Sequence, residues 1–211
     1  MRRPYRRSGA GLAKPGRYQP MPFQLVFRRP SAHGLAGSTK LPHSLLGYVI
    51  ECLVEAYVLI GAGGRLTTAR PDVDVDHKDF IVDERGGYRS AYAQVKGSSR
   101  LSKSGRFTVS VDYPAHRVLS DPRLIYVFCL VDLKAMVLSR AWVVPASEFS
   151  RLASRTYLSN GQVRLWFEAG KTGKWDKFAV DPRLMGTRII KHIEASNLGR
   201  ATRTSRSRKA A

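Results

Sequence analysis

The stretch YAQVKGS, residues 92–98, places two polar side chains, Gln94 and Lys96, two positions apart in a short apolar run. Side chains alternate between the two faces of a strand, so Gln94 and Lys96 share one face while Ala93 and Val95 take the other. The stretch therefore has two interpretations. It is either a strand with a solvent-exposed polar face or a strand that contributes two side chains to an active site.

The residues before this stretch predict the other half of a β-hairpin. The apolar run 80–82 is typical of a strand, a Gly-Gly pair at 86–87 supplies a turn, and residues 88–95 form the return strand. Asp79 comes directly before the first strand. If its carboxylate faces the same side as Gln94, polar groups from both strands converge at one end of the hairpin.

A helix is predicted upstream of the hairpin, from Ser44, which can act as its N-cap, to Gly61. Its buried face is expected to consist of apolar residues spaced three and four apart: Leu46, Ile50, Leu53, Tyr57 and Ile60. Glu51 and Glu55 lie one turn apart on one side of this helix, and either carboxylate could join the polar end of the hairpin.

The remaining pattern predicts an α/β domain around a mixed β-sheet flanked by helices. The run 124–133 is nearly all apolar, which is typical of a strand buried on both faces. Further strands are expected at 65–69, 107–111, 140–145 and 163–169, and further helices at 114–119, from Ser147 onward and at 182–196.

Basic residues are concentrated at the two ends of the chain. The formal net charge is +20, and residues 1–50 carry nine Lys or Arg without an Asp or Glu. We expect a basic, largely disordered N-terminal arm at 1–39, one domain at 40–196 and a basic, disordered tail at 197–211. Such a charge favours acidic partners, nucleic acid first and an anionic membrane surface second.

The cysteines and the hydropathy pattern indicate the compartment. Cys52 and Cys129 lie in apolar stretches, and two buried thiols without a disulfide framework fit a reducing, cytoplasmic environment. Because the sequence lacks an uninterrupted apolar run of 18 residues, we expect no transmembrane helix and no membrane as a partner.

Asp79, Gln94 and Lys96 offer chemistry suited to hydrolysis of a phosphodiester. A carboxylate and an amide oxygen are hard ligands for Mg²⁺, which retains several of its waters in proteins. A lysine beside the metal can orient an attacking water or stabilise the charge that develops on a phosphate.

The order of these motifs resembles that of the PD-(D/E)XK nuclease superfamily, whose members share the restriction-endonuclease-like fold. The resemblance is strongest to the branch with the core motif Q-x-K, related to archaeal Holliday-junction resolvases and Mrr-type restriction enzymes. It covers about residues 44–150. The matching segments are GYVIECLVEAYVLIG (47–61), KDFIVDE (78–84), AQVKGS (93–98), IYVFCLVD (125–132) and RAWVVPASEF (140–149).

The resemblance implies a DNA endonuclease that depends on Mg²⁺ or Mn²⁺. It implies that Glu51, Asp79 and Gln94 hold the metal ion and that Lys96 serves the attacking water or the scissile phosphate. Two acids rival these ligands: Asp76, in a segment crowded with aspartates, and Glu55, one helical turn from Glu51.

The loop after the Q-x-K motif is expected to contact nucleic acid. It is basic and rich in Gly and Ser, and we expect Arg100, Lys103 and Arg106 to bind the DNA backbone through their charge. DNA is the expected partner, and a homodimer is compatible with the sequence.

Two other functions are compatible with the same features. The domain could be a catalytically inactive module that binds nucleic acid with the same fold. Alternatively, the basic ends could belong to a protein of a membrane surface or the ribosome, a function that leaves the aspartate-rich segment unexplained.

Overall fold

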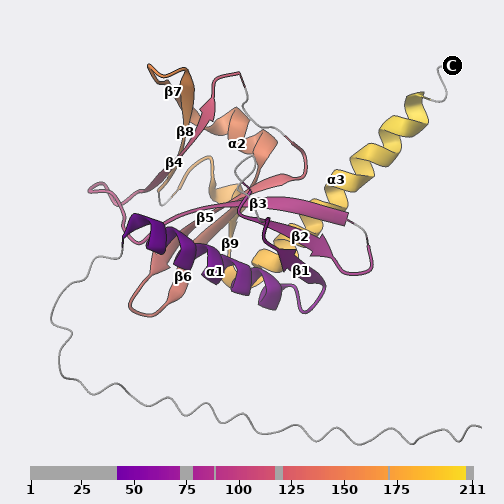
Figure 1. Cartoon of the computed structure of the whole chain (residues 1–211), viewed down its shortest axis with the longest axis horizontal. Coiled ribbons are helices and arrows are strands. Elements are labelled where there is room, and N and C mark those ends of the chain that lie inside the picture. Colours follow the sequence, from indigo (N-terminus) through magenta and orange to yellow (C-terminus); the bar gives the residue numbers. More distant parts are fainter. Residues whose placement is uncertain (1–41, 72–77, 88, 117–120, 171, 208–211) are drawn as a thin grey trace, which may run out of the picture. The chain divides into compact units, whose positions relative to one another are not determined.

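The computed structural model describes residues 42–71, 78–87, 89–116, 121–170 and 172–207, with side chains described up to residue 196 (Figure 1). Its centre is a six-stranded sheet in the order β1-β2-β3-β5-β6-β9. Strands β3 and β5 run parallel and all other neighbours are antiparallel, which confirms the expected mixed sheet. The strands are β1 (Leu66–Ala69), β2 (Phe80–Glu84), β3 (Arg89–Ser98), β5 (Leu124–Asp132), β6 (Val137–Pro145) and β9 (Ala179–Val180).

Two helices, α1 (His43–Gly61) and α3 (Met185–Ser207), cover one face of this sheet (Figure 1). The buried residues of α1 are Ile50, Val54 and Val58, spaced four apart, so they form one stripe that packs on the sheet. The short helix η2 (Pro182–Leu184) leads from β9 into α3.

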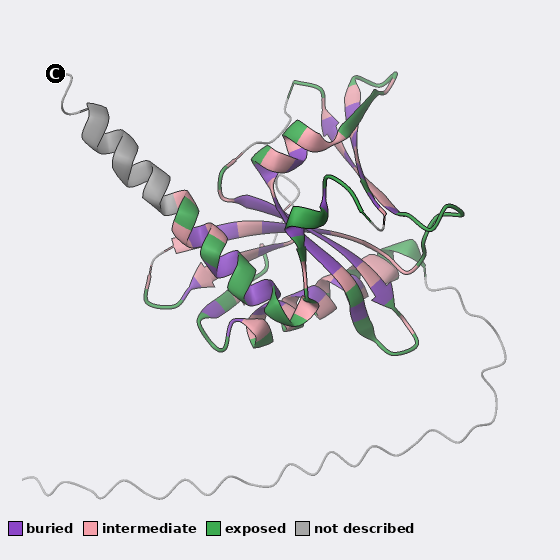
Figure 2. Ribbon diagram, turned by 180° about the vertical axis from the view of Figure 1, so that it is seen from behind, coloured by how far each residue is buried: buried purple, intermediate pink, exposed green. Residues whose placement is uncertain are grey.

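A second layer covers the opposite face of the six-stranded sheet. It consists of a three-stranded antiparallel sheet in the order β4-β8-β7 and the helix α2 (Ala146–Leu152), and aromatic side chains fill the space between the layers. Phe128 of the main sheet stacks on Phe167 of the second sheet, with ring centroids 4.0 Å apart. Figure 2 shows the buried residues concentrated along the central strands. The strands are β4 (Phe107–Pro114), β7 (Ser154–Tyr157) and β8 (Gln162–Ala169). The short helix η1 (Asp176–Phe178) adds Phe178 to this core, and the residue before it adds Trp175.

Several details of the helices differ from the sequence-based predictions. Helix α1 begins at His43 after Pro42, without the predicted Ser44 side-chain cap, and Ile60 is exposed because the buried stripe passes through Val58 instead. Helix α2 likewise begins at Ala146 without a side-chain cap from Ser147. Helix α3 continues past residue 196, where the domain was expected to end.

The predicted helix at 114–119 is wrong at its start, because Pro114 is the last residue of β4. Residues 117–120, the arm at 1–39 and residues 208–211 lie outside the described residues. The sequence also did not predict that the strands divide between two sheets, and it missed β7 and β9.

The expectation that both thiols are buried is wrong for one of them. Cys129 is buried as expected, whereas Cys52 is exposed. Among the described helices, α1 is long and apolar enough to cross a membrane by length and composition alone. In this structure α1 buries one stripe against the sheet, which is also how the core helix of a domain behaves.

The crossing of α1 and α3 predicts opposite effects for two Gly→Ala substitutions. A Cβ at Gly186 would lie 2.2 Å from the Val58 carbonyl oxygen, so we expect Gly186→Ala to cost about 2–3 kcal/mol of stability despite its better helix propensity. Gly47 in α1 has nothing within 4 Å of its Cβ position, and Gly47→Ala should stabilise by about 0.5–1 kcal/mol. Urea denaturation measures both, and a neutral Gly186→Ala would contradict the close crossing.

Candidate active site

Asp79 is fixed at the point where β2 begins and β3 continues beyond it. The antiparallel register pairs Phe80 with Ala93, and the Asp79 backbone N–H donates to the Ala93 carbonyl at 2.9 Å. This pairing places Asp79 opposite Gln94, on the face directed away from α1 and α3. The Asp79 carboxylate accepts a hydrogen bond from the Val95 N–H at 2.5 Å, which holds it at the fork between the strands.

Gln94 points into the space between the two sheets, where it is 1% exposed. The interpretation of this strand face as solvent-exposed is therefore wrong for Gln94. Its amide oxygen accepts a hydrogen bond of 2.9 Å from the Tyr113 hydroxyl of β4. The Tyr113 hydroxyl is also hydrogen-bonded to that of Tyr126, which pairs with Gln94 in the β3–β5 register.

The Tyr113 hydroxyl also lies within the electrostatic influence of Asp79. Burial raises the pKa of Tyr113 to about 12, the hydrogen bond with Tyr126 opposes this rise, and the negative charge of Asp79 adds to it. Tyr113 is therefore protonated at neutral pH and donates to Gln94. Asp79, Gln94 and Tyr113 form one group at the fork, brought together from β2, β3 and β4.

Lys96 is half-buried and follows Gln94 on the same strand face. The pKa of Asp112 is lowered mainly by the hydrogen bond from Arg164, and the positive charge of Lys96 adds to this effect. Arg164 binds Asp112 through two hydrogen bonds of 2.7 Å. The Lys96 ammonium thus lies near the carboxylate of Asp112 on β4.

Tyr113 and Asp112 were missed as members of the site. Both belong to the stretch FTVSVDYP, which sequence reasoning treated only as a strand. The available signal was its alternation, which puts Tyr113 on the same face as the apolar Val109 and Val111 and so predicts a buried hydroxyl that needs a partner.

The two acids of α1 are both bound by Arg70, a residue that was not predicted. Arg70 lies 3.1 Å from the carboxylate of Glu51 and 2.9 Å from that of Glu55. Glu55 also accepts a hydrogen bond of 2.6 Å from Thr68. The contacts of Glu51 therefore connect it to Arg70, while Asp76, the rival of Asp79, lies outside the described residues.

The donors at the fork suit a magnesium ion that keeps part of its water shell. The described residues contain no group of three or more His, Cys, Asp or Glu side chains arranged for a metal ion. The fork instead offers the carboxylate of Asp79 and the amide oxygen of Gln94. Donors of these two types occur in Mg²⁺ sites, in which the ion also keeps several waters.

The loop from β3 to β4 presents Arg100 and Lys103 to solvent. It is closed by a backbone hydrogen bond of 2.7 Å between residues 102 and 106. Arg106 is also exposed but forms an ion pair of 2.9 Å with Glu168 of β8, so part of its charge is already compensated.

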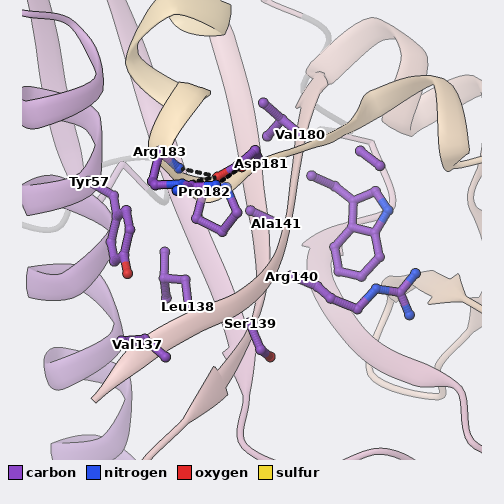
Figure 3. A pocket seen from close by; sticks show the side chains of 12 residues that line it. Tyr57, Val137, Leu138, Ser139, Arg140, Ala141, Val180, Asp181, Pro182 and Arg183 are labelled. Carbon is purple, nitrogen blue, oxygen red and sulfur yellow. Dashed lines mark hydrogen bonds and ion pairs between the residues drawn. The ribbon is translucent and has the colours of Figure 1, made fainter. Parts of the chain in front are cut away.

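A groove of about 670 Å³ lies elsewhere, along the edge of β6 (Figure 3). Tyr57 of α1, residues 137–142 and residues 179–183 line it, and Asp181 and Arg183 form an ion pair on its wall. None of the predicted site residues lines this groove, so we assign the candidate site to the fork.

No protein-family model and no curated protein sequence matches the chain. Among solved structures, a bacterial homing endonuclease, I-Ssp6803I, is similar at 14% sequence identity with a TM-score of 0.49. The match covers 73% of this chain and 98% of that chain. A likeness this distant assigns neither a family nor a site residue.

The closeness of Asp79 and Tyr113 predicts a change in a tyrosine pKa. Asp79→Asn keeps an oxygen that can accept from the Val95 N–H but removes the negative charge, and ionisation of Tyr113 then becomes easier. We expect the pKa of Tyr113 to fall from about 12 toward its ordinary value, with burial keeping it raised. NMR of ¹³C-labelled tyrosine measures this pKa. Asp83→Asn, on the same strand, is the control, and an unchanged pKa in Asp79→Asn would contradict the proximity.

Proposed function

We propose that this protein is a DNA endonuclease that hydrolyses phosphodiester bonds with Mg²⁺ or Mn²⁺ at the fork of β2 and β3. The observation that carries the proposal is the position of Asp79 opposite Gln94, with Lys96 following on the same strand face. These side chains come from neighbouring strands whose hydrogen bonds fix their register.

Each residue has a role that follows from its chemistry. The Asp79 carboxylate and the Gln94 amide oxygen hold the metal ion, which supplies an activated water and a positive charge beside the phosphate. Lys96 orients the water or stabilises the phosphate charge as it develops. Glu51 lies on α1, the helix that covers the other face of the sheet, where Arg70 binds it, so the proposed roles do not include it.

The charge distribution supports nucleic acid as the substrate. The chain carries a formal net charge of +20, and the exposed side chains of Arg100 and Lys103 lie on the loop that directly continues β3. This loop begins a few residues after Lys96. Backbone phosphates held by the loop would therefore lie close to the candidate site.

An inactive nucleic-acid-binding module remains the second candidate because of two specific observations. Gln94 is almost completely buried, and Glu51 and Glu55 are both compensated by Arg70. A site with one carboxylate ligand attracts a divalent cation more weakly than a site with two or three. Activity measurements separate the two candidates.

Lys96→Ala should reduce DNA cleavage by about 100-fold or more, because it removes the positive charge beside the reacting phosphate. Asp79→Ala should abolish cleavage by removing the anionic ligand, and a chelator should do the same to the unmodified protein. Lys134→Ala, which removes an equal charge from an exposed turn, is the control and should cleave normally. The readout is nicking of duplex, branched and single-stranded DNA with Mg²⁺ or Mn²⁺. Tight DNA binding without metal-dependent cleavage would favour the inactive module.

The β3–β4 loop should bind phosphates without reading sequence. Each phosphate neutralised on duplex DNA contributes about 0.9 to the slope of log K against log salt concentration. Arg100→Ser combined with Lys103→Ser should therefore flatten that slope by about 1–2 and weaken binding to all sequences alike. Fluorescence anisotropy at several salt concentrations measures the slope, with Lys134→Ser as the control. An unchanged slope would remove the loop from the DNA interface.

A further inference from the structure

We propose that Tyr113 and Tyr126 are positioning residues that hold the Gln94 amide with its oxygen toward the metal ion, so that a neutral glutamine can serve as a ligand at this position. The inference rests on the proposed function, because it concerns the same metal site. It adds two residues, from β4 and β5, that do not contact the reacting groups themselves.

The hydrogen bonds between these three side chains have one direction. The Tyr113 hydroxyl donates its single proton to the Gln94 amide oxygen at 2.9 Å. In the contact between the two hydroxyls, Tyr126 must therefore be the donor and Tyr113 the acceptor. All three side chains are 1% exposed, so water does not compete appreciably for these groups.

A glutamine ligand has an orientation problem that a carboxylate does not have. The two ends of an amide have nearly the same shape, but only the oxygen binds a cation, whereas the NH₂ group repels it. The two oxygens of a carboxylate are equivalent, so rotation by 180° changes nothing. At position 94, a rotated amide would lose the hydrogen bond from Tyr113, while the oriented amide keeps a second lone pair on its oxygen for the metal.

A purely structural role for the hydroxyls makes a different prediction from a positioning role. If Tyr113 only satisfies a buried polar group, Tyr113→Phe lowers stability whether residue 94 is Gln or Glu, and metal affinity follows stability in both cases. If Tyr113 positions the amide, loss of its hydroxyl reduces metal affinity only when residue 94 is Gln, whose side chain ends in one oxygen and one NH₂ group.

The experiment compares Mn²⁺ affinity in four full-length proteins: the unmodified chain, Tyr113→Phe, Gln94→Glu and the double variant. Isothermal titration calorimetry gives the affinity, with and without a DNA duplex in Ca²⁺-free buffer. We expect Tyr113→Phe to weaken Mn²⁺ binding about tenfold when residue 94 is Gln, in the range found for residues that orient metal ligands. With Glu at position 94, the same substitution should change the affinity by less than about twofold. A carboxylate presents an oxygen to the ion in either orientation, so it does not need the hydrogen bond from Tyr113 to orient it.

Three controls complete the design. Tyr126→Phe should cause a smaller loss in the same direction, because it removes only the donor behind Tyr113, and it decides the question if Tyr113→Phe does not fold. Tyr157→Phe removes an exposed hydroxyl and should leave Mn²⁺ affinity unchanged. Thermal unfolding without metal reports the stability of each variant separately.

The two ideas fail in distinguishable ways. Equal losses of Mn²⁺ affinity with Gln and Glu at position 94, or no loss with either, would overturn the positioning role while leaving the nuclease proposal intact. An unmodified protein that binds no Mn²⁺ and cleaves no DNA would overturn the proposed function and this inference with it.

Discussion

The architecture depends on β5, a strand that is buried on both faces. Its alternate residues divide between two cores: Val127 and Cys129 pack toward α1 and α3, whereas Tyr126 and Phe128 pack toward the second sheet. A strand of this kind requires a layer on each side, and both layers are present. Because β3 runs parallel beside β5, the same alternation directs Gln94 into the space between the sheets. The candidate site is thus a consequence of how the central strand is covered.

Local patterns predicted the elements well, because alternation and helical spacing are properties of a few neighbouring residues. The common face of Gln94 and Lys96 follows from alternation alone, and so does the two-sided burial of β5. Alternation does not predict which residues cover that face, because Tyr113 contacts Gln94 from 19 positions further along the chain. The error at Ile60 has a similar origin: spacings of three and four allow adjacent stripes on a helix, and only the position of the sheet selects the one through Val58.

The fork itself could be anticipated, since a hairpin with a tight turn brings its two outer ends together. The sequence placed Asp79 directly before one strand and Gln94 on the other, and the observed register sets them opposite each other. Ionic partners are harder to predict because long side chains reach across elements. Arg70, beyond β1, binds Glu51 and Glu55 on α1, and no local pattern in either segment indicates this pairing.

The ion pair between Glu51 and Arg70 is a weak one. Both side chains are partly exposed, Arg70 at 34% and Glu51 at 26%, and ion pairs at such positions contribute about 0–1 kcal/mol. Arg70 would also keep a partner, because its ion pair with Glu55 does not involve Glu51. In a chain with a net charge of +20, Arg70 thus neutralises two acids of α1, the helix on the sheet face opposite Gln94.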